Sequence, residues 1–174
     1  MTLRSLQTSL PLLGVLLLSS LGGALPALAA PADAALLKSY VGDYTGKGVL
    51  TGTSAQPVTC RLSLRPGDGD KVNYTGRCQV AGASFSLSGV MSYVAAKGRF
   101  EAAMTSSGGS GVAIGQKRDG GVVFSSKQQM TAEGHSGTVT STLALAGGTL
   151  RVDFSMLEDK TGKTTAGTIL FIKS

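Results

Sequence analysis

Two alternating segments on either side of a dense turn motif constrain the fold of this chain more than any other feature of its sequence. Within Val58–Val80, apolar and polar residues alternate on both sides of the motif Pro66-Gly67-Asp68-Gly69-Asp70, a pattern typical of two β-strands joined by a turn. Symmetric pairing about Gly69 places three opposed pairs on one face: Cys60 with Cys78, Leu62 with Gly76, and Leu64 with Tyr74. Opposed residues of an antiparallel pair hold their Cβ atoms at a separation that a disulfide can bridge. The sequence therefore predicts a hairpin closed by a Cys60–Cys78 disulfide.

The N-terminal residues predict export to an oxidising compartment, where a disulfide persists. Arg4 is followed by an apolar run and then by the small-residue motif Ala27-Leu28-Ala29, the pattern of a cleavable signal peptide. The alternative is a permanent membrane anchor, but proline and glycine interrupt the run and no basic cluster follows it. We therefore expect residues 1–29 to be a signal peptide and the mature protein to be periplasmic or secreted, not membrane-spanning after processing.

The rest of the chain, about 145 residues, is long enough for one domain with a buried core. Residues 30–42 predict an N-terminal segment in which Asp33 caps a short helix over Ala34–Val41. Residues 43–174 predict a β-barrel-like domain, because period-2 alternation recurs between turn signals. Besides the two hairpin strands, the expected strands are Tyr44–Thr51, Ser84–Tyr93, Arg99–Thr105, Val112–Lys117, Val122–Gln128, Thr138–Leu145, Leu150–Met156 and Thr165–Lys173.

This succession of short strands predicts an all-β fold, either a small antiparallel up-and-down barrel of about 8–10 strands or a curled sandwich. The last strand is apolar on both faces over residues 168–172, so its second face needs cover. We expect Leu36 and Leu37 of the N-terminal helix to provide that cover. We also expect Ile114, Leu170 and Ile172 to point into the barrel.

No constellation of catalytic, cofactor-binding or metal-ligating residues stands out in the sequence. His135 is the only histidine and both cysteines are assigned to the disulfide, so a zinc site or a catalytic triad has too few partners. Gly162-Lys163-Thr164 resembles the end of a phosphate-binding loop, but Leu157 occupies the position of its first glycine. We therefore expect a protein that is not an enzyme and that needs no cofactor and no metal.

The basic residues of the hairpin form one candidate site for contact with an anion. The predicted register makes Arg61 and Arg77 direct cross-strand neighbours on the outward face, with Arg65 and Lys71 further along it. Like charges in opposed positions are unfavourable, so the two arginines either extend into water, pair with an acid from another strand, or clamp an anion. The net charge of +6 is spread along the chain without a basic run, and we expect no nucleic-acid partner.

The barrel interior forms the second candidate site. A barrel of ten strands encloses more volume than one of about eight, whose interior side chains just fill it. The chain has no tryptophan to fill the space, so we expect an apolar cavity of about 300 Å³ or more. Tyr44, Tyr74 and Tyr93 are the expected inward aromatic residues with a hydroxyl, which makes them the candidate polar anchors for a ligand.

The order Tyr44-x-Gly46-x-Gly48, Val58-x-Cys60-Arg61-Leu62 and Gly76-x-Cys78 resembles a group of small uncharacterised exported proteins of Gram-negative, especially alphaproteobacterial, species. The resemblance covers residues 44–90 and implies a periplasmic β-barrel-like domain with one disulfide and no catalytic residues. The size and single disulfide are also similar to those of the small lipocalin-like periplasmic protease inhibitors. That family usually has a core tryptophan, and its inhibitory N-terminal trunk is not recognisable in Pro31–Tyr40.

Three functions remain open from these observations. The leading hypothesis is a non-enzymatic exported barrel that binds a small apolar ligand or an envelope partner. The alternatives are an inhibitor of secreted proteases and an envelope structural protein that contacts anionic polymers or surfaces. An open barrel with an unfilled apolar interior favours the first. A filled barrel with a protruding, ordered N-terminal segment favours the inhibitor, and a filled barrel with a contiguous basic face favours the envelope contact.

Overall fold

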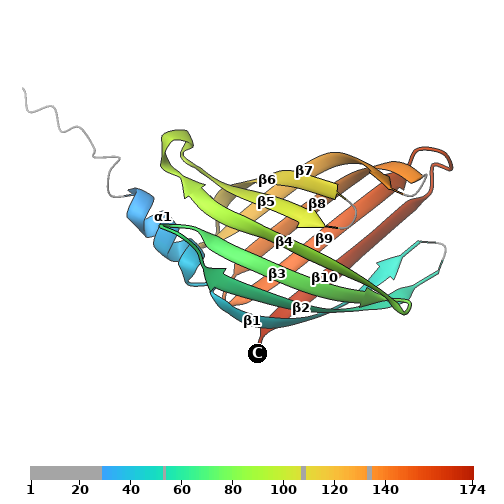
Figure 1. Ribbon diagram of the computed structural model, residues 1–174, viewed down its shortest axis with the longest axis horizontal. Helices are drawn as coiled ribbons and strands as arrows, with labels where there is room; N and C mark the ends of the chain where they lie inside the picture. Colours follow the sequence, from blue (N-terminus) through green and yellow to red (C-terminus); the bar gives the residue numbers. More distant parts are fainter. Residues whose placement is uncertain (1–28, 53, 107–108, 133–134) are drawn as a thin grey trace, which may run out of the picture.

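The computed structural model describes residues 29–52, 54–106, 109–132 and 135–174. A short helix, α1 (Ala29–Lys38), precedes ten antiparallel strands that close into a barrel (Figure 1). A 3-10 turn, η2 (Ala95–Lys97), links β4 to β5. The strands are β1 Gly42–Thr51, β2 Gln56–Pro66, β3 Val72–Val80, β4 Ala83–Val94, β5 Arg99–Ser106, β6 Gly109–Arg118, β7 Gly121–Ala132, β8 His135–Ala146, β9 Thr149–Glu158 and β10 Thr164–Lys173.

The strands follow one another around the barrel in chain order, and β10 pairs with β1 to close it. The predicted up-and-down barrel is therefore confirmed. Its hairpin β2–β3 has the predicted register, with Cys60 opposite Cys78 and Arg61 opposite Arg77. The predicted disulfide is confirmed as well, with an S–S distance of 1.98 Å. It links two neighbouring strands from within the barrel, because both cysteines are buried.

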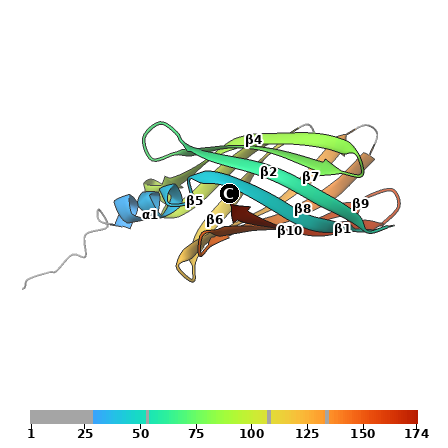
Figure 2. The same ribbon diagram turned by 90° about the horizontal axis from the view of Figure 1, so that it is seen from below.

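One end of the barrel is filled by side chains. It is the end at which α1 leads into β1, seen on the left of Figures 1 and 2. The strand ends that meet there supply most of the fully buried apolar side chains: Leu64, Val72, Met91, Phe100, Val122, Phe124, Leu145 and Leu150. Burial of side chains of this size supplies much of the free energy that holds a small domain together. This end of the barrel is a packed core.

Helix α1 packs across the filled end of the barrel and covers it. Leu37 is fully buried among the core residues, and the Tyr40 hydroxyl donates a hydrogen bond of 3.0 Å to the carbonyl of Leu145. The predicted start of the helix at Asp33 is wrong. The helix begins at Ala29, and the Asp33 carboxylate instead accepts a hydrogen bond from Lys117 at 2.9 Å, which ties α1 to β6. The expected signal peptide lies outside the described residues, apart from Ala29.

The predicted cover of the last strand is also wrong. Helix α1 packs at the barrel end, and the outward side chains of Leu170 and Ile172 remain 47% and 61% exposed. Ile169 and Phe171 point inward in their place, because the pairing with β1 sets Phe171 opposite Gly46 in the inward row. Period-2 geometry then turns the two neighbouring residues outward. The same alternation turns Ile114 outward, where it pairs with Glu101.

Candidate functional site: an apolar cavity with an open mouth

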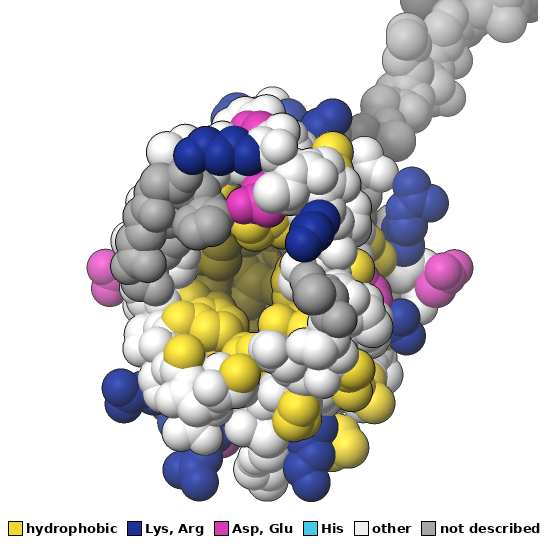
Figure 3. All heavy atoms as spheres, turned by 90° about the vertical axis from the view of Figure 1, so that its right-hand side faces the viewer, with side chains coloured by type: hydrophobic (Ala, Val, Ile, Leu, Met, Phe, Trp, Pro, Cys, Tyr) yellow, Lys and Arg dark blue, Asp and Glu magenta, His cyan; other side chains and the backbone are white. Residues whose placement is uncertain are grey.

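The half of the barrel away from α1 contains an apolar cavity. Figure 3 looks into this end and shows a recess lined by hydrophobic side chains. The cavity has a volume of about 150 Å³, and it is bordered by apolar residues such as Leu62, Leu87, Met104, Leu143 and Val152. The expected apolar cavity in the barrel interior is present. Its expected size of about 300 Å³ or more is wrong by about a factor of two.

Small residues create the cavity and one large residue limits it. Ala102 and Ala113 face each other on β5 and β6 and leave space in front of them. On the adjoining strands β3 and β4, the Tyr74 ring lies across the backbone of Gly89, where a Cβ atom would lie 2.5 Å from the ring carbon Cζ. A side chain at position 89 would push this ring away. The ring therefore fills the space beside Gly89 and reduces the volume of the cavity.

The three tyrosines predicted as polar anchors do not lie together. Tyr74 lines the cavity, whereas Tyr44 and Tyr93 lie outside its lining. The Tyr44 hydroxyl donates a hydrogen bond of 2.7 Å to the carbonyl of Tyr40, beside α1. The Tyr93 ring packs edge-on against Phe100, with a centroid distance of 5.0 Å. Of the three, only Tyr74 is placed to contact a molecule in the cavity.

The hydroxyl of Tyr74 is already engaged by the barrel wall. It donates a hydrogen bond of 3.0 Å to the backbone carbonyl of Ala103. Burial raises the pKa of Tyr74 from 10.0 to about 12, because the low-polarity interior disfavours the phenolate. The phenol therefore stays neutral at ordinary pH, and its one proton is not available to a ligand.

A short polar strip on β7 and β8 interrupts the apolar lining. The hydroxyls of Ser126 and Ser141 lie 2.8 Å apart and hydrogen-bond to each other. One step further toward the mouth, the side-chain amide of Gln128 packs against the backbone of Gly111, where a Cβ would lie 1.9 Å from its Nε2 and Oε1 atoms. Sequence analysis missed this strip. The signal for it is the alternation of Phe124, Ser126 and Gln128 on one face of β7.

The Gln128 amide makes no hydrogen bond to any residue in the described part of the chain. Its neighbour Gln129 shows the contrast, because its amide points outward and donates to the Thr138 hydroxyl at 2.9 Å. None of the described residues that line the cavity is charged. The cavity thus combines an apolar wall with one free amide, and it can hold a small, mainly apolar molecule.

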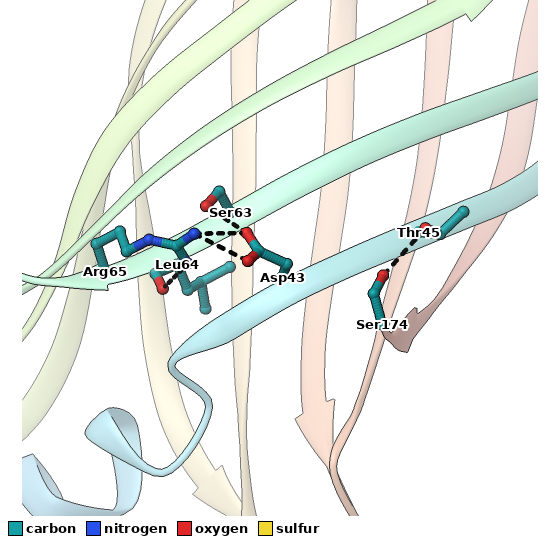
Figure 4. Close-up of polar contacts among 6 residues, drawn as sticks. All are labelled: Asp43, Thr45, Ser63, Leu64, Arg65 and Ser174. Carbon is teal, nitrogen blue, oxygen red and sulfur yellow. Dashed lines mark hydrogen bonds and ion pairs between the residues drawn. The ribbon is translucent and has the colours of Figure 1, made fainter.

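The predicted anion site lies on the outer surface. Arg61 and Arg77 are opposed on β2 and β3 and form no ion pair with any residue that the structure describes. Arg65 instead pairs with Asp43 at 2.7 Å (Figure 4), and hydrogen bonds from Ser63 and Arg65 lower the pKa of Asp43.

The remaining member of that predicted set, Lys71, lies in the turn before β3 and is exposed. A shallow hollow beside Arg61 and Arg77 is lined by Thr45, Thr59 and Gln79. Of the four predicted cations, Arg61 and Arg77 are thus direct neighbours, and the four are not gathered at one point.

The described residues hold neither a cluster of metal-ligating side chains nor a helix able to span a membrane. No group of three or more histidine, cysteine, aspartate or glutamate side chains is arranged to hold a metal ion within residues 29–174, leaving aside the undescribed gaps. Among the described helices, none has the length and apolar character needed to cross a membrane. The disulfide indicates an oxidising environment for the folded protein.

Comparisons with known proteins identify the fold and leave the site open. No protein-family model and no curated protein matches the chain. Among solved structures, Rv2717c from M. tuberculosis is similar with a TM-score of 0.65 and 12% sequence identity, over 83% of this chain and 98% of that one. An S-type phycobiliprotein lyase, CPES from Guillardia theta, is similar with a TM-score of 0.50 and 8% identity, over 83% of this chain and 97% of the other. At these identities the likeness shows a shared barrel fold.

Proposed function

We propose that this protein is a non-enzymatic, exported barrel that binds a small apolar ligand, or the apolar end of a larger one, through its open mouth. The observation that carries the proposal is the cavity itself, which is apolar, uncharged in its described lining, and open at the end away from α1. Ligand sites in proteins are typically concave and mostly apolar, with a few polar groups that fix orientation.

The cavity volume limits the ligand. An apolar cavity of about 150 Å³ is large enough to hold a benzene molecule in full. A longer molecule would place only one end in the barrel and would extend through the mouth. The proposal is therefore narrower than a carrier that encloses a drug-sized ligand.

A stability measurement with benzene tests the proposal. A ligand that binds only the folded state raises the melting temperature, by roughly 4 °C at a concentration ten times its Kd. The substitution Ala113→Leu adds three carbons in front of Ala102 and fills the cavity, so we expect this variant to lose the benzene effect. Ala103→Leu is the matched control, because residue 103 is exposed on the outer face of the same pair of strands.

The pattern across the three proteins decides the outcome. A shift in the wild type and in Ala103→Leu, and none in Ala113→Leu, supports binding in the barrel. Equal shifts in all three proteins, or no shift in the wild type, would remove the proposal.

A second candidate function, contact with an anionic envelope surface, is favoured by the outer face of β10, β1, β2 and β3. Arg61, Arg77 and Lys47 form no ion pair with a described residue, and Leu170 and Ile172 are exposed on the adjoining strand. Cations beside exposed apolar side chains are typical of surfaces that bind anionic lipid. By contrast, α1 packs into the barrel end, and nothing in the described residues supports the protease-inhibitor alternative.

Sedimentation with anionic phospholipid vesicles tests this second candidate. The double variant Arg61→Gln/Arg77→Gln should lose binding. The variant Arg118→Gln/Lys127→Gln, which removes the same charge from β6 and β7, should retain it. Equal loss in both variants would show a dependence on net charge and not on this face.

A further inference from the structure

We propose that the ligand of the cavity is uncharged and carries one hydrogen-bonding group, which binds the side-chain amide of Gln128. This inference rests on the proposed function and names the chemical class of the ligand. Gln128 projects from β7 into the cavity, at the level of Gly111 on the neighbouring strand. The amide fits there because residue 111 is a glycine: any side chain at this position would overlap the amide atoms.

The other inward polar groups of the lining have hydrogen-bond partners within the barrel. Tyr74 donates to the Ala103 carbonyl, and one of the Ser126 and Ser141 hydroxyls donates to the other. Thr142 also borders the cavity, but its strand position pairs with Asp153, in the row that faces outward. Among the described lining residues, Gln128 is thus the one with an inward polar side chain that makes no hydrogen bond to the protein.

An amide without a partner is suited to a specific kind of ligand. Gln128 is half-buried and its amide is open to water, so a ligand group that replaces this water must offer the amide an equivalent hydrogen bond. The Gln128 side chain offers two donors and one acceptor oxygen, so it can bind a hydroxyl, a carbonyl or an amide group. A bound molecule with such a group near one end of an apolar body would satisfy the amide and would leave the rest of its surface against Leu87, Met104 and Leu143.

The absence of charge in the described lining excludes an ionised group at the same depth. A carboxylate or ammonium group taken from water into an apolar site is strongly disfavoured unless a counter-charge or several hydrogen bonds compensate it. None of the described residues around the cavity is charged, and one amide cannot replace the hydration of a carboxylate. The cavity should therefore discriminate against ionised analogues of its ligand.

Three probes that share one phenyl ring separate these effects, namely benzene, benzyl alcohol and benzoate. Their Kd values are measured by NMR, from methyl shifts of the cavity residues, in the wild type, in Gln128→Met and in Gln129→Met. Methionine keeps the length of the side chain and removes the amide. Gln129→Met makes the same change on the outer face and serves as the control.

We expect benzyl alcohol to bind the wild type at least tenfold more tightly than benzoate does. Gln128→Met should raise the Kd of benzyl alcohol about fivefold, as the loss of one hydrogen bond predicts, and should leave the Kd of benzene unchanged. Gln129→Met should match the wild type for all three probes. Benzene binding to Gln128→Met also shows that this variant is folded.

The outcomes that contradict the two proposals are distinct. Absence of benzene binding to the wild type removes the proposed function. Benzene binding together with unchanged benzyl alcohol affinity in Gln128→Met, or with tighter binding of benzoate than of benzyl alcohol, overturns the inference about Gln128 and leaves the apolar site in place.

Discussion

Loss of the Cys60–Cys78 disulfide is expected to destabilise the barrel by about 3 kcal/mol. The two cysteines are 18 residues apart, and closing a loop of that length restricts the unfolded chain by an entropy worth roughly this amount at room temperature. Both cysteines are buried, at 3% and 4% exposed. The double variant Cys60→Ala/Cys78→Ala is therefore the appropriate test, since serine would add the cost of a buried hydroxyl.

Urea unfolding followed by circular dichroism measures this change. A domain of this kind has a free energy of unfolding of about 5–15 kcal/mol, so the variant should still fold with a lower midpoint. The wild type in reductant should lose the same free energy as the variant, and reductant should not affect the variant. A loss below about 1 kcal/mol, or two free thiols in the exported protein, would refute the reasoning.

Three further predictions concern the closed end, the cavity wall and the N-terminus. Leu37→Ala should lower the free energy of unfolding by about 2–5 kcal/mol, measured by urea unfolding, because Leu37 is fully buried; an effect equal to that of a surface substitution would show that α1 does not seal the barrel. Burial raises the pKa of Tyr74 to about 12, so the unfolded chain releases this phenol proton first. The contribution of Tyr74 to the free energy of unfolding should be fully present below pH 10 and should be lost as the pH rises toward 12. Tyr74→Phe should reduce this loss, and an identical pH profile for the variant would contradict the assignment. Intact-mass analysis of the exported protein should find a chain that begins at or near Ala30, and a full-length chain in the membrane fraction would show an anchor instead.

The sequence was most informative where two independent patterns agreed. In the β2–β3 hairpin, the turn motif and the positions of Cys60 and Cys78 specify the same register, so the pairing was predicted residue by residue. The strand positions followed from period-2 alternation. Alternation fails where both faces are apolar, and in β10 the face of Leu170 and Ile172 is set by pairing with β1, which the strand itself does not encode.

The cavity depended on contacts between strands that no local pattern reveals. Its volume is reduced because the Tyr74 ring lies over Gly89, and its polar group is placed because the Gln128 amide lies over Gly111. Both contacts pair a large side chain on one strand with a glycine on a neighbouring strand. The sequence shows the glycines, but not which side chain each of them receives.

The most direct test of the central claim is to locate a bound apolar molecule in the barrel. In methyl NMR spectra of the protein titrated with benzene, we expect saturable shifts for Leu87, Met104 and Val152, which line the cavity. The methyl groups of Val112 and Ile172, which are 56% and 61% exposed on the outer face, should not move. Shifts confined to the outer face, or no saturable shift at the cavity methyl groups, would contradict the account of this protein as an interior-binding barrel.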